Sequence, residues 1–98
     1  FTGLLVANDQ MALGALRALH QRGLQLPRDV SVVGFDDIPE AAFLEPPLTT
    51  IRQDFSLLAQ RSLDQLKACI DQPNAPRHLT MLVPELIVRS STAAPRQP

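Results

Sequence analysis

The sequence predicts an α/β fold in which short parallel strands and helices form Rossmann-like layers. Three short stretches that read as strands carry the prediction, at residues 3–7, 30–35 and 48–52, and the most apolar of them is 30–35. None shows the strict alternation of apolar and polar residues that is typical of a strand with one solvent-exposed face. Continuous runs of this length are typical of strands buried on both faces of a parallel sheet. Stretches with helical spacing of apolar residues follow the first and third runs, which is the element order of βαβ units.

Length and composition fit one small folded domain of 98 residues, 45% of them apolar. The basic residues are scattered, so the chain lacks the basic stripe that neutralises a nucleic-acid backbone. With Cys69 as its single cysteine, the chain cannot form an internal disulfide or a cysteine metal cluster, and we expect no metal and no cofactor. No apolar stretch reaches the roughly 18–20 residues of a membrane helix, so no membrane partner is expected.

The first half of the chain predicts strand, helix and strand. The first strand covers Gly3–Ala7, and a helix follows at about Gln10–Arg22. Asp9 is the expected N-cap of this helix, and Gly23 supplies the left-handed residue that ends it. The second strand is expected at Val30–Phe35.

The second half continues the same order. Asp37 is expected to cap a short helical turn, and a third strand is expected at Leu48–Arg52. Asp54 then caps the longest helix, Phe55–Asp71, whose apolar residues form one stripe at helical spacing.

The last extended segment, Leu79–Arg89, is interrupted by Pro84, which predicts an edge strand or a crossing between two sheets. Residues 90–98 contain little to bury, so we expect a disordered tail. Because the chain begins at Phe1 and enters a strand at once, we expect it to be part of a longer polypeptide.

The candidate site residues come from polar pairs at the ends of the three expected strands. These pairs are Asn8-Asp9, Asp36-Asp37 and Gln53-Asp54. A helix cap needs one side chain, so the first member of each pair is left free. In open α/β sheets the carboxyl ends of the strands face the ligand crevice. We therefore predict that Asn8, Asp36 and Gln53 converge on one polar ligand.

The side-chain types indicate a ligand rich in hydroxyl groups. Amides both donate and accept hydrogen bonds, and an ionised carboxylate accepts strongly from O–H groups. Phe55 could stack on the apolar C–H face of a sugar, so a sugar is the predicted ligand. The alternatives are that Asn8 shares in capping, that Asp36 bonds to nearby backbone N–H groups, and that Phe55 is the first core position of its helix.

An enzymatic alternative starts from the two adjacent acids. Asp36 and Asp37 could hold Mg²⁺, with one of them accepting a phosphoryl group. That chemistry also needs a lysine at a neighbouring strand end, whereas Lys67 lies within the long helix. We therefore predict that the chain is not an enzyme.

Three segments, in this order and spacing, resemble the LacI/GalR family. They are Val6–Gly14, Ser31–Asp37 and Pro46–Phe55, and the resemblance extends over residues 4–89. It implies part of a type I periplasmic-binding-protein-like core that binds an effector, often a sugar. Residues 1–52 would belong to the C-terminal subdomain, 53–78 would form a helix of the other subdomain, and 79–89 would be a returning strand.

The resemblance also implies a function. Members of the family are cytoplasmic transcriptional repressors whose effector changes DNA binding allosterically. Operator DNA would be bound only through an N-terminal domain that this chain lacks. The positions of Asn8, Asp36, Gln53 and Phe55 correspond to effector contacts. A homodimer is implied as well, and its interface residues would be Met11, Leu13, Leu16, Arg17 and Leu44.

A periplasmic sugar-binding protein of the same fold is the first alternative. The phosphoryl-transfer enzyme is the second. The sequence leaves open the identity of the effector and the choice between induction and corepression.

Overall fold

The computed structural model describes residues 1–97, which form two compact units. The first unit combines residues 1–52 with those from Glu85 onward, and the second unit spans Gln53–Pro84. The first unit is therefore discontinuous in sequence.

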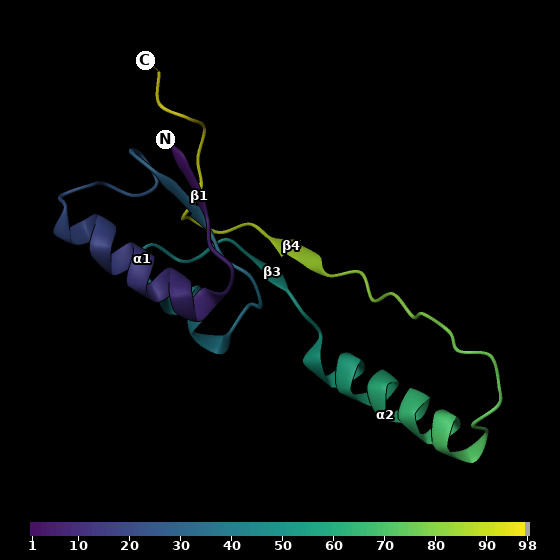
Figure 1. Ribbon diagram of the computed structural model, residues 1–98. Coiled ribbons are helices and arrows are strands. Elements are labelled where there is room, and N and C mark those ends of the chain that lie inside the picture. Colours follow the sequence, from purple (N-terminus) through teal and green to yellow (C-terminus); the bar gives the residue numbers. More distant parts are fainter. Residues whose placement is uncertain (98) are drawn as a thin grey trace. The chain divides into compact units, whose positions relative to one another are not determined.

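A parallel pair of strands lies at the centre of the first unit (Figure 1). Strand β1 (Gly3–Leu5) pairs with β2 (Ser31–Val33), with Leu4 opposite Val32. Isolated parallel bridges, Val33 to Thr49 and Asp36 to Arg52, continue this pairing toward the third strand. The predicted α/β fold with a parallel sheet is thus confirmed.

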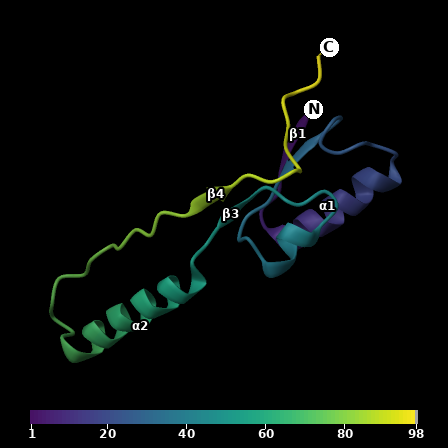
Figure 2. The ribbon, with the colours of Figure 1, turned by 180° about the vertical axis from the view of Figure 1, so that it is seen from behind.

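Helix α1 (Asp9–Gln21) packs beside this pair of strands, as both ribbon views show (Figures 1 and 2). The core gathers apolar side chains from the strands, the helix and the segment before the third strand. Its buried members are Val6, Ala12, Leu16, Val30, Val32, Ala41 and Leu48. At roughly 1.5–3 kcal/mol for each large aliphatic side chain, this burial stabilises the unit.

The cap of α1 differs from the prediction. Asn8 is the N-cap, and its side chain accepts a hydrogen bond from the backbone N–H of Met11 at 2.8 Å. Asp9 is the first helical residue and is fully buried. The assignment of Asp9 as the cap was wrong, because its carboxylate is taken up by partners inside the unit. Gly23, with a φ of 75°, follows the helix as predicted.

The short helical turn is a 3-10 helix, η1 (Pro39–Phe43). Ile38 occupies its N-cap position without a side-chain hydrogen bond, so the prediction that Asp37 caps it was wrong. Both oxygens of Asp37 are bound by arginines instead. Ala41 is fully buried, and its carbonyl accepts a hydrogen bond from the N–H of Leu48 at 2.9 Å.

Strand β3 (Thr50–Arg52) leads out of the first unit, and β4 (Glu85–Ile87) leads back into it. The two strands pair antiparallel, with Ile51 opposite Leu86. Strand β4 begins directly after Pro84, as expected of a residue that has no N–H to donate to a ladder.

The segment after β4 is built into the first unit. Ser91 is fully buried, its carbonyl accepts from the N–H of Val32 at 2.8 Å, and its hydroxyl donates to the carbonyl of Val32 at 2.6 Å. The same hydroxyl accepts from the N–H of Thr49 at 2.8 Å. The N–H of Ala93 bonds the hydroxyl of Ser31. The predicted disordered tail was therefore wrong for residues 90–93, because their polar atoms complete the hydrogen bonding of the sheet.

The second unit consists of α2 (Phe55–Asp71) and an extended return segment that runs back along it (Figures 1 and 2). Asp54 caps the helix as predicted, accepting from the N–H of Leu57 at 3.0 Å. The side-chain amide of Gln65 donates to the carbonyl of His78 and the hydroxyl of Thr80, which holds the two segments together. No residue of α2 is buried by the described part of the chain, so its apolar stripe lies exposed there.

Substitution of Gly34 tests how tightly the core is packed around it. A Cβ added there would overlap Oδ1 of the buried Asp9 and touch Leu48. Gly34→Ala should lower the free energy of unfolding by about 1–3 kcal/mol, as overpacked cores do. Urea denaturation measures this.

Gly14→Ala is the matched control, because a Cβ at Gly14, inside α1, would meet no atom within 4 Å. It should stabilise the chain by about 0.5–1 kcal/mol through better helix propensity. Equal effects of the two substitutions would contradict the packing described for Gly34.

Ser91→Ala tests the inserted C-terminal segment. The substitution leaves the N–H of Thr49 and the carbonyl of Val32 without their buried hydroxyl partner. It should cost about 1–3 kcal/mol of stability. The exposed neighbour Ser90 contributes only its backbone N–H, so Ser90→Ala should stay within about 0.5 kcal/mol of the parent.

Candidate functional site

Asn8 and Asp36 lie at one edge of the first unit. The N–H of Asp9 donates to the carbonyl of Phe35 at 2.9 Å, so the residues that follow β1 and β2 are held side by side. Asn8 precedes this hydrogen bond and Asp36 follows it. The structure thus brings together two of the three residues predicted to contact a ligand, at the carboxyl ends of adjacent parallel strands.

Asn8 is only partly free. Its side-chain oxygen caps α1, which leaves the amide nitrogen as the group that could donate to a ligand. The capping role that the sequence left open as an alternative is therefore real. It also fixes the side chain, because the cap holds the amide in one orientation at the sheet edge.

Asp36 has a half-buried side chain and an unusual backbone conformation. Its φ is 121°, a region that favours glycine, and its N–H donates to the carbonyl of Ile51 at 2.8 Å. Within the described residues, 1–97, its carboxylate takes part in no hydrogen bond or ion pair. A carboxylate held in this way can accept hydrogen bonds from an incoming ligand.

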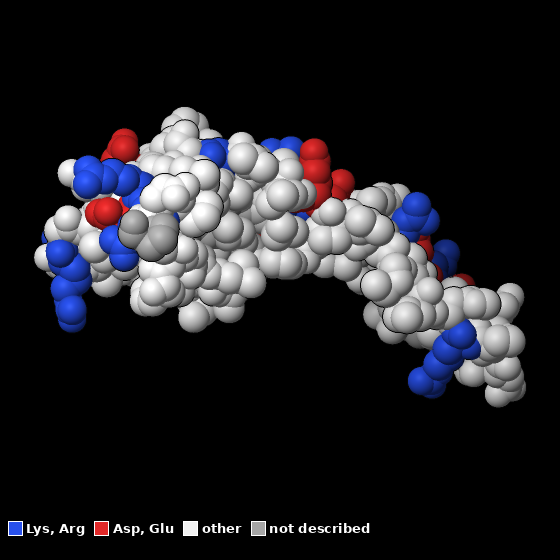
Figure 3. All heavy atoms as spheres, turned by 90° about the horizontal axis from the view of Figure 1, so that it is seen from above, with Lys and Arg blue, Asp and Glu red and all other residues white. Residues whose placement is uncertain are grey.

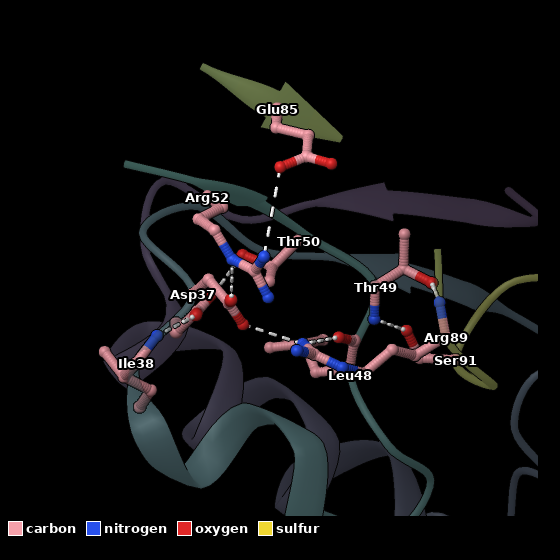
Figure 4. Close-up of polar contacts among 10 residues, drawn as sticks. Asp37, Ile38, Leu48, Thr49, Thr50, Arg52, Glu85, Arg89 and Ser91 are labelled. Atoms are coloured by element: carbon pink, nitrogen blue, oxygen red, sulfur yellow. Dashed lines mark hydrogen bonds and ion pairs between the residues drawn. The ribbon is translucent and has the colours of Figure 1, made fainter. Parts of the chain in front are cut away.

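Asp37 is the centre of a group of ion pairs drawn in Figure 4. One carboxylate oxygen accepts from Nε of Arg52 at 2.8 Å, and the other accepts from Nη1 of Arg89 at 2.8 Å. The Asp37 side chain is 8% exposed. Arg89 also donates to the carbonyl of Leu48 at 2.9 Å, and Glu85 lies 3.9 Å from Arg52. The turn after β2 is thereby tied to β3 and to the segment that follows β4.

These contacts shift two pKa values. Burial of Asp37 alone would raise the pKa of its carboxyl, but the hydrogen bonds and charges of Arg89 and Arg52 outweigh it and hold that pKa below its usual value. The hydrogen bond to Asp37 raises the pKa of Arg52. Asp37 is therefore ionised throughout the neutral range, and its ion pairs persist there.

Asp9 is a buried carboxylate with two hydrogen-bond donors. Its oxygens accept from the hydroxyl of Thr50 at 2.6 Å and from the N–H of Ile38 at 3.0 Å. The sequence did not indicate this role, nor those of Arg52, Arg89 and Ser91. The available signal was Gly34, a small residue in an apolar run, which makes room for the Asp9 carboxylate.

Gln53 and Phe55 belong to the second unit. Gln53 helps line a pocket of about 240 Å³ within that unit, together with polar and apolar side chains of α2 and the return segment. Phe55 is 54% exposed, so it is available to a ligand. The predicted convergence of Gln53 with Asn8 and Asp36 involves both units and stays a prediction. A pocket of about 420 Å³ beside Cys69 and His78 contains none of the predicted ligand contacts.

The candidate interface residues divide into two groups. Met11, Leu13 and Arg17 are exposed on α1, whereas Leu44 is half-buried and packs against the core. Leu16 is 4% exposed and belongs to the core cluster. The assignment of Leu16 to an interface was therefore wrong, because the core of its own unit already covers it.

Three properties of the described residues concern charge, metal ligation and membrane insertion. On the face drawn in Figure 3, the Lys and Arg side chains of the described residues form no continuous field. The described residues contain no group of three His, Cys, Asp or Glu side chains that could hold a metal ion. Within the same residues, none of the helices combines the length and the apolar character needed to cross a membrane.

The comparisons with known proteins agree with the fold. A family model for the periplasmic binding protein-like domain matches residues 2–92. The lactose operon repressor of Escherichia coli (strain K12) is 49% identical over 94 residues, which cover 96% of this chain and 26% of that protein. The chain spans about a quarter of the length of the curated relatives it matches.

Two solved structures show the same architecture. The lac repressor dimer bound to operator and the anti-inducer ONPF has a TM-score of 0.87 and 48% identity, over 95% of this chain and 32% of that chain. A regulator from Enterococcus faecium with bound ribose has a TM-score of 0.85 and 34% identity, over 98% of this chain and 35% of that chain.

The ion pairs of Asp37 predict a loss of stability in acid. Because the folded-state pKa of Asp37 lies below its unfolded value, its contribution is complete above the unfolded pKa, at about pH 4, and disappears as pH falls through the folded pKa. The free energy of unfolding of the parent should therefore fall more steeply below about pH 4 than that of Asp37→Asn. Urea denaturation between neutral pH and pH 2 measures the two slopes, and parallel curves would refute the link.

Proposed function

Because this chain belongs to the periplasmic binding protein-like family, and within it to the LacI-type regulators, we propose that it is an effector-binding segment of a transcriptional repressor. The effector is a sugar or a similar small molecule. The repressor acts in the cytoplasm and binds operator DNA through an N-terminal domain outside this chain.

One observation carries the proposal. Asp36 is a half-buried residue at the edge where β1 and β2 end, the same edge as Asn8, and no described residue bonds its carboxylate. A carboxylate acceptor next to an amide donor matches adjacent hydroxyl groups of a sugar. Gln53 contributes a second amide and Phe55 an apolar face. The ribose bound to the regulator from Enterococcus faecium supports a sugar as the effector class.

The effector acts by favouring one arrangement of the two subdomains over another. A ligand shifts such an equilibrium only by the difference between its affinities for the two states. Strands β3 and β4 are the two places where the chain passes between its units, so a change in subdomain arrangement is transmitted through them.

In the proposed homodimer, two such cores pair, and the DNA-binding domains of both subunits bind one operator. The exposed Met11, Leu13 and Arg17 of α1 and the half-buried Leu44 contribute to its interface. The lac repressor structure with its operator is a dimer, which supports this assembly. Binding, not catalysis, is the activity proposed, because the positive charges of Arg52 and Arg89 beside Asp37 disfavour a cation shared with Asp36.

Asp36→Asn in the full-length repressor tests the site. The substitution keeps the shape of the side chain and removes the charge that strengthens its hydrogen bonds to hydroxyl groups. The affinity for the effector sugar should fall by about 10- to 100-fold. Isothermal titration with ribose, galactose, glucose, lactose and maltose measures it, and operator affinity should stay within about twofold because the DNA-binding domain is untouched.

Asp64→Asn is the matched control, because Asp64 is an exposed acid on α2 that makes no ion pair among the described residues. It should leave sugar affinity unchanged. An Asp36→Asn protein that binds the same sugar as tightly as the parent would refute the proposed contact.

A further inference from the structure

Two adjacent residues at the candidate site have a backbone conformation that side chains rarely adopt. The φ angles of Asp36 and Asp37 are 121° and 58°. For residues other than glycine such angles cost free energy, and they persist only where the surrounding structure fixes them. Strain of this kind is concentrated at ligand-binding positions.

The contacts that fix this turn come from both sides of it. The N–H of Asp36 bonds the carbonyl of Ile51, and the N–H of Ile38 bonds the buried carboxylate of Asp9. Between these two anchors, the Asp37 carboxylate is bound by Arg52 and Arg89. We call these three residues, Asp37, Arg52 and Arg89, the Asp37 clamp.

The clamp is itself anchored. Arg89 donates to the carbonyl of Leu48 as well as to Asp37, and its N–H donates to the hydroxyl of Thr49 at 2.9 Å. Figure 4 shows the two arginines approaching the carboxylate from β3 and from the segment after β4. Because Asp37 is only 8% exposed, water competes little for its oxygens. The clamp therefore has the rigidity needed to hold a strained backbone.

From this arrangement we infer that Asp37 is a positioning residue for the effector site: the clamp holds the strained turn in the conformation that presents the Asp36 carboxylate to the ligand. The inference rests on the proposed function, since it assumes that Asp36 contacts the effector. In this inference Asp37 acts without touching the ligand: an arginine binds each of its oxygens, and its side chain is only 8% exposed.

A double-mutant cycle in the full-length repressor tests the inference. Asp37→Ala removes the clamp and adds a residue that disfavours positive φ. It should weaken binding of the sugar selected from the panel of ribose, galactose, glucose, lactose and maltose by roughly tenfold. In an Asp36→Asn background the same substitution should cost much less, because the carboxylate it positions is already gone. Equal costs in the two backgrounds would overturn the inference and indicate a general loss of stability.

A second measurement needs no ligand. The amide proton of Asp36 should exchange with solvent at least tenfold faster in Asp37→Ala than in the parent, while that of Ala12 in α1 stays unchanged. An unchanged Asp36 amide, or equal acceleration of both, would overturn the inference. If no sugar of the panel binds the parent, the proposed function fails instead. The exchange rates then still show whether the Asp37 clamp holds the backbone at Asp36.

Two further variants serve as a milder substitution of Asp37 and as a control. Asp37→Asn tolerates positive φ and keeps one acceptor oxygen, so it should show the same non-additivity with a smaller loss. Glu85→Ala removes only the exposed partner 3.9 Å from Arg52 and should change sugar affinity by less than about twofold. An effect of Glu85→Ala as large as that of Asp37→Ala would contradict the role given to the clamp.

Discussion

The buried carboxylate of Asp9 is the constraint on which the first unit depends. It accepts hydrogen bonds from the hydroxyl of Thr50 and the N–H of Ile38, and it fits only because Gly34 has no side chain. A buried polar group is tolerated when hydrogen-bond partners surround it and is costly when they are removed. The start of α1, the turn after β2 and strand β3 are thereby held to one another, and the edge that carries the candidate site takes its shape from this contact.

The elements that were predictable from the sequence are those set by local signals. Apolar runs gave the parallel strands, helical spacing gave both helices, and Asp54 followed the usual preference for an N-cap. The choice between Asn8 and Asp9 could not be made locally, since both residue types are good caps. It was decided by Thr50, more than forty residues away, whose hydroxyl bonds the carboxylate of Asp9.

The candidate site was partly predictable for a related reason. Adjacent parallel strands end at one edge, so the closeness of Asn8 and Asp36 followed from the strand pattern. The commitment of Asp37 to two arginines did not, because Arg89 reaches it from the far end of the sequence. The segment around Ser91 was misjudged for the same reason: its composition is that of a loop, and its partners Val32 and Thr49 are visible only in the fold.

The insertion of Ser91 between β2 and the chain at Thr49 also bears on how the protein is made. During synthesis the residues of the second unit leave the ribosome before those that complete the first. Until Ser91 emerges, the N–H groups of Val32 and Thr49 lack the partners they have in the finished molecule. The nascent chain therefore cannot complete the hydrogen bonding of this sheet before residue 91 is synthesised. A polypeptide truncated before Ser91 would lack the hydrogen bonds that join Val32 and Thr49 through this serine.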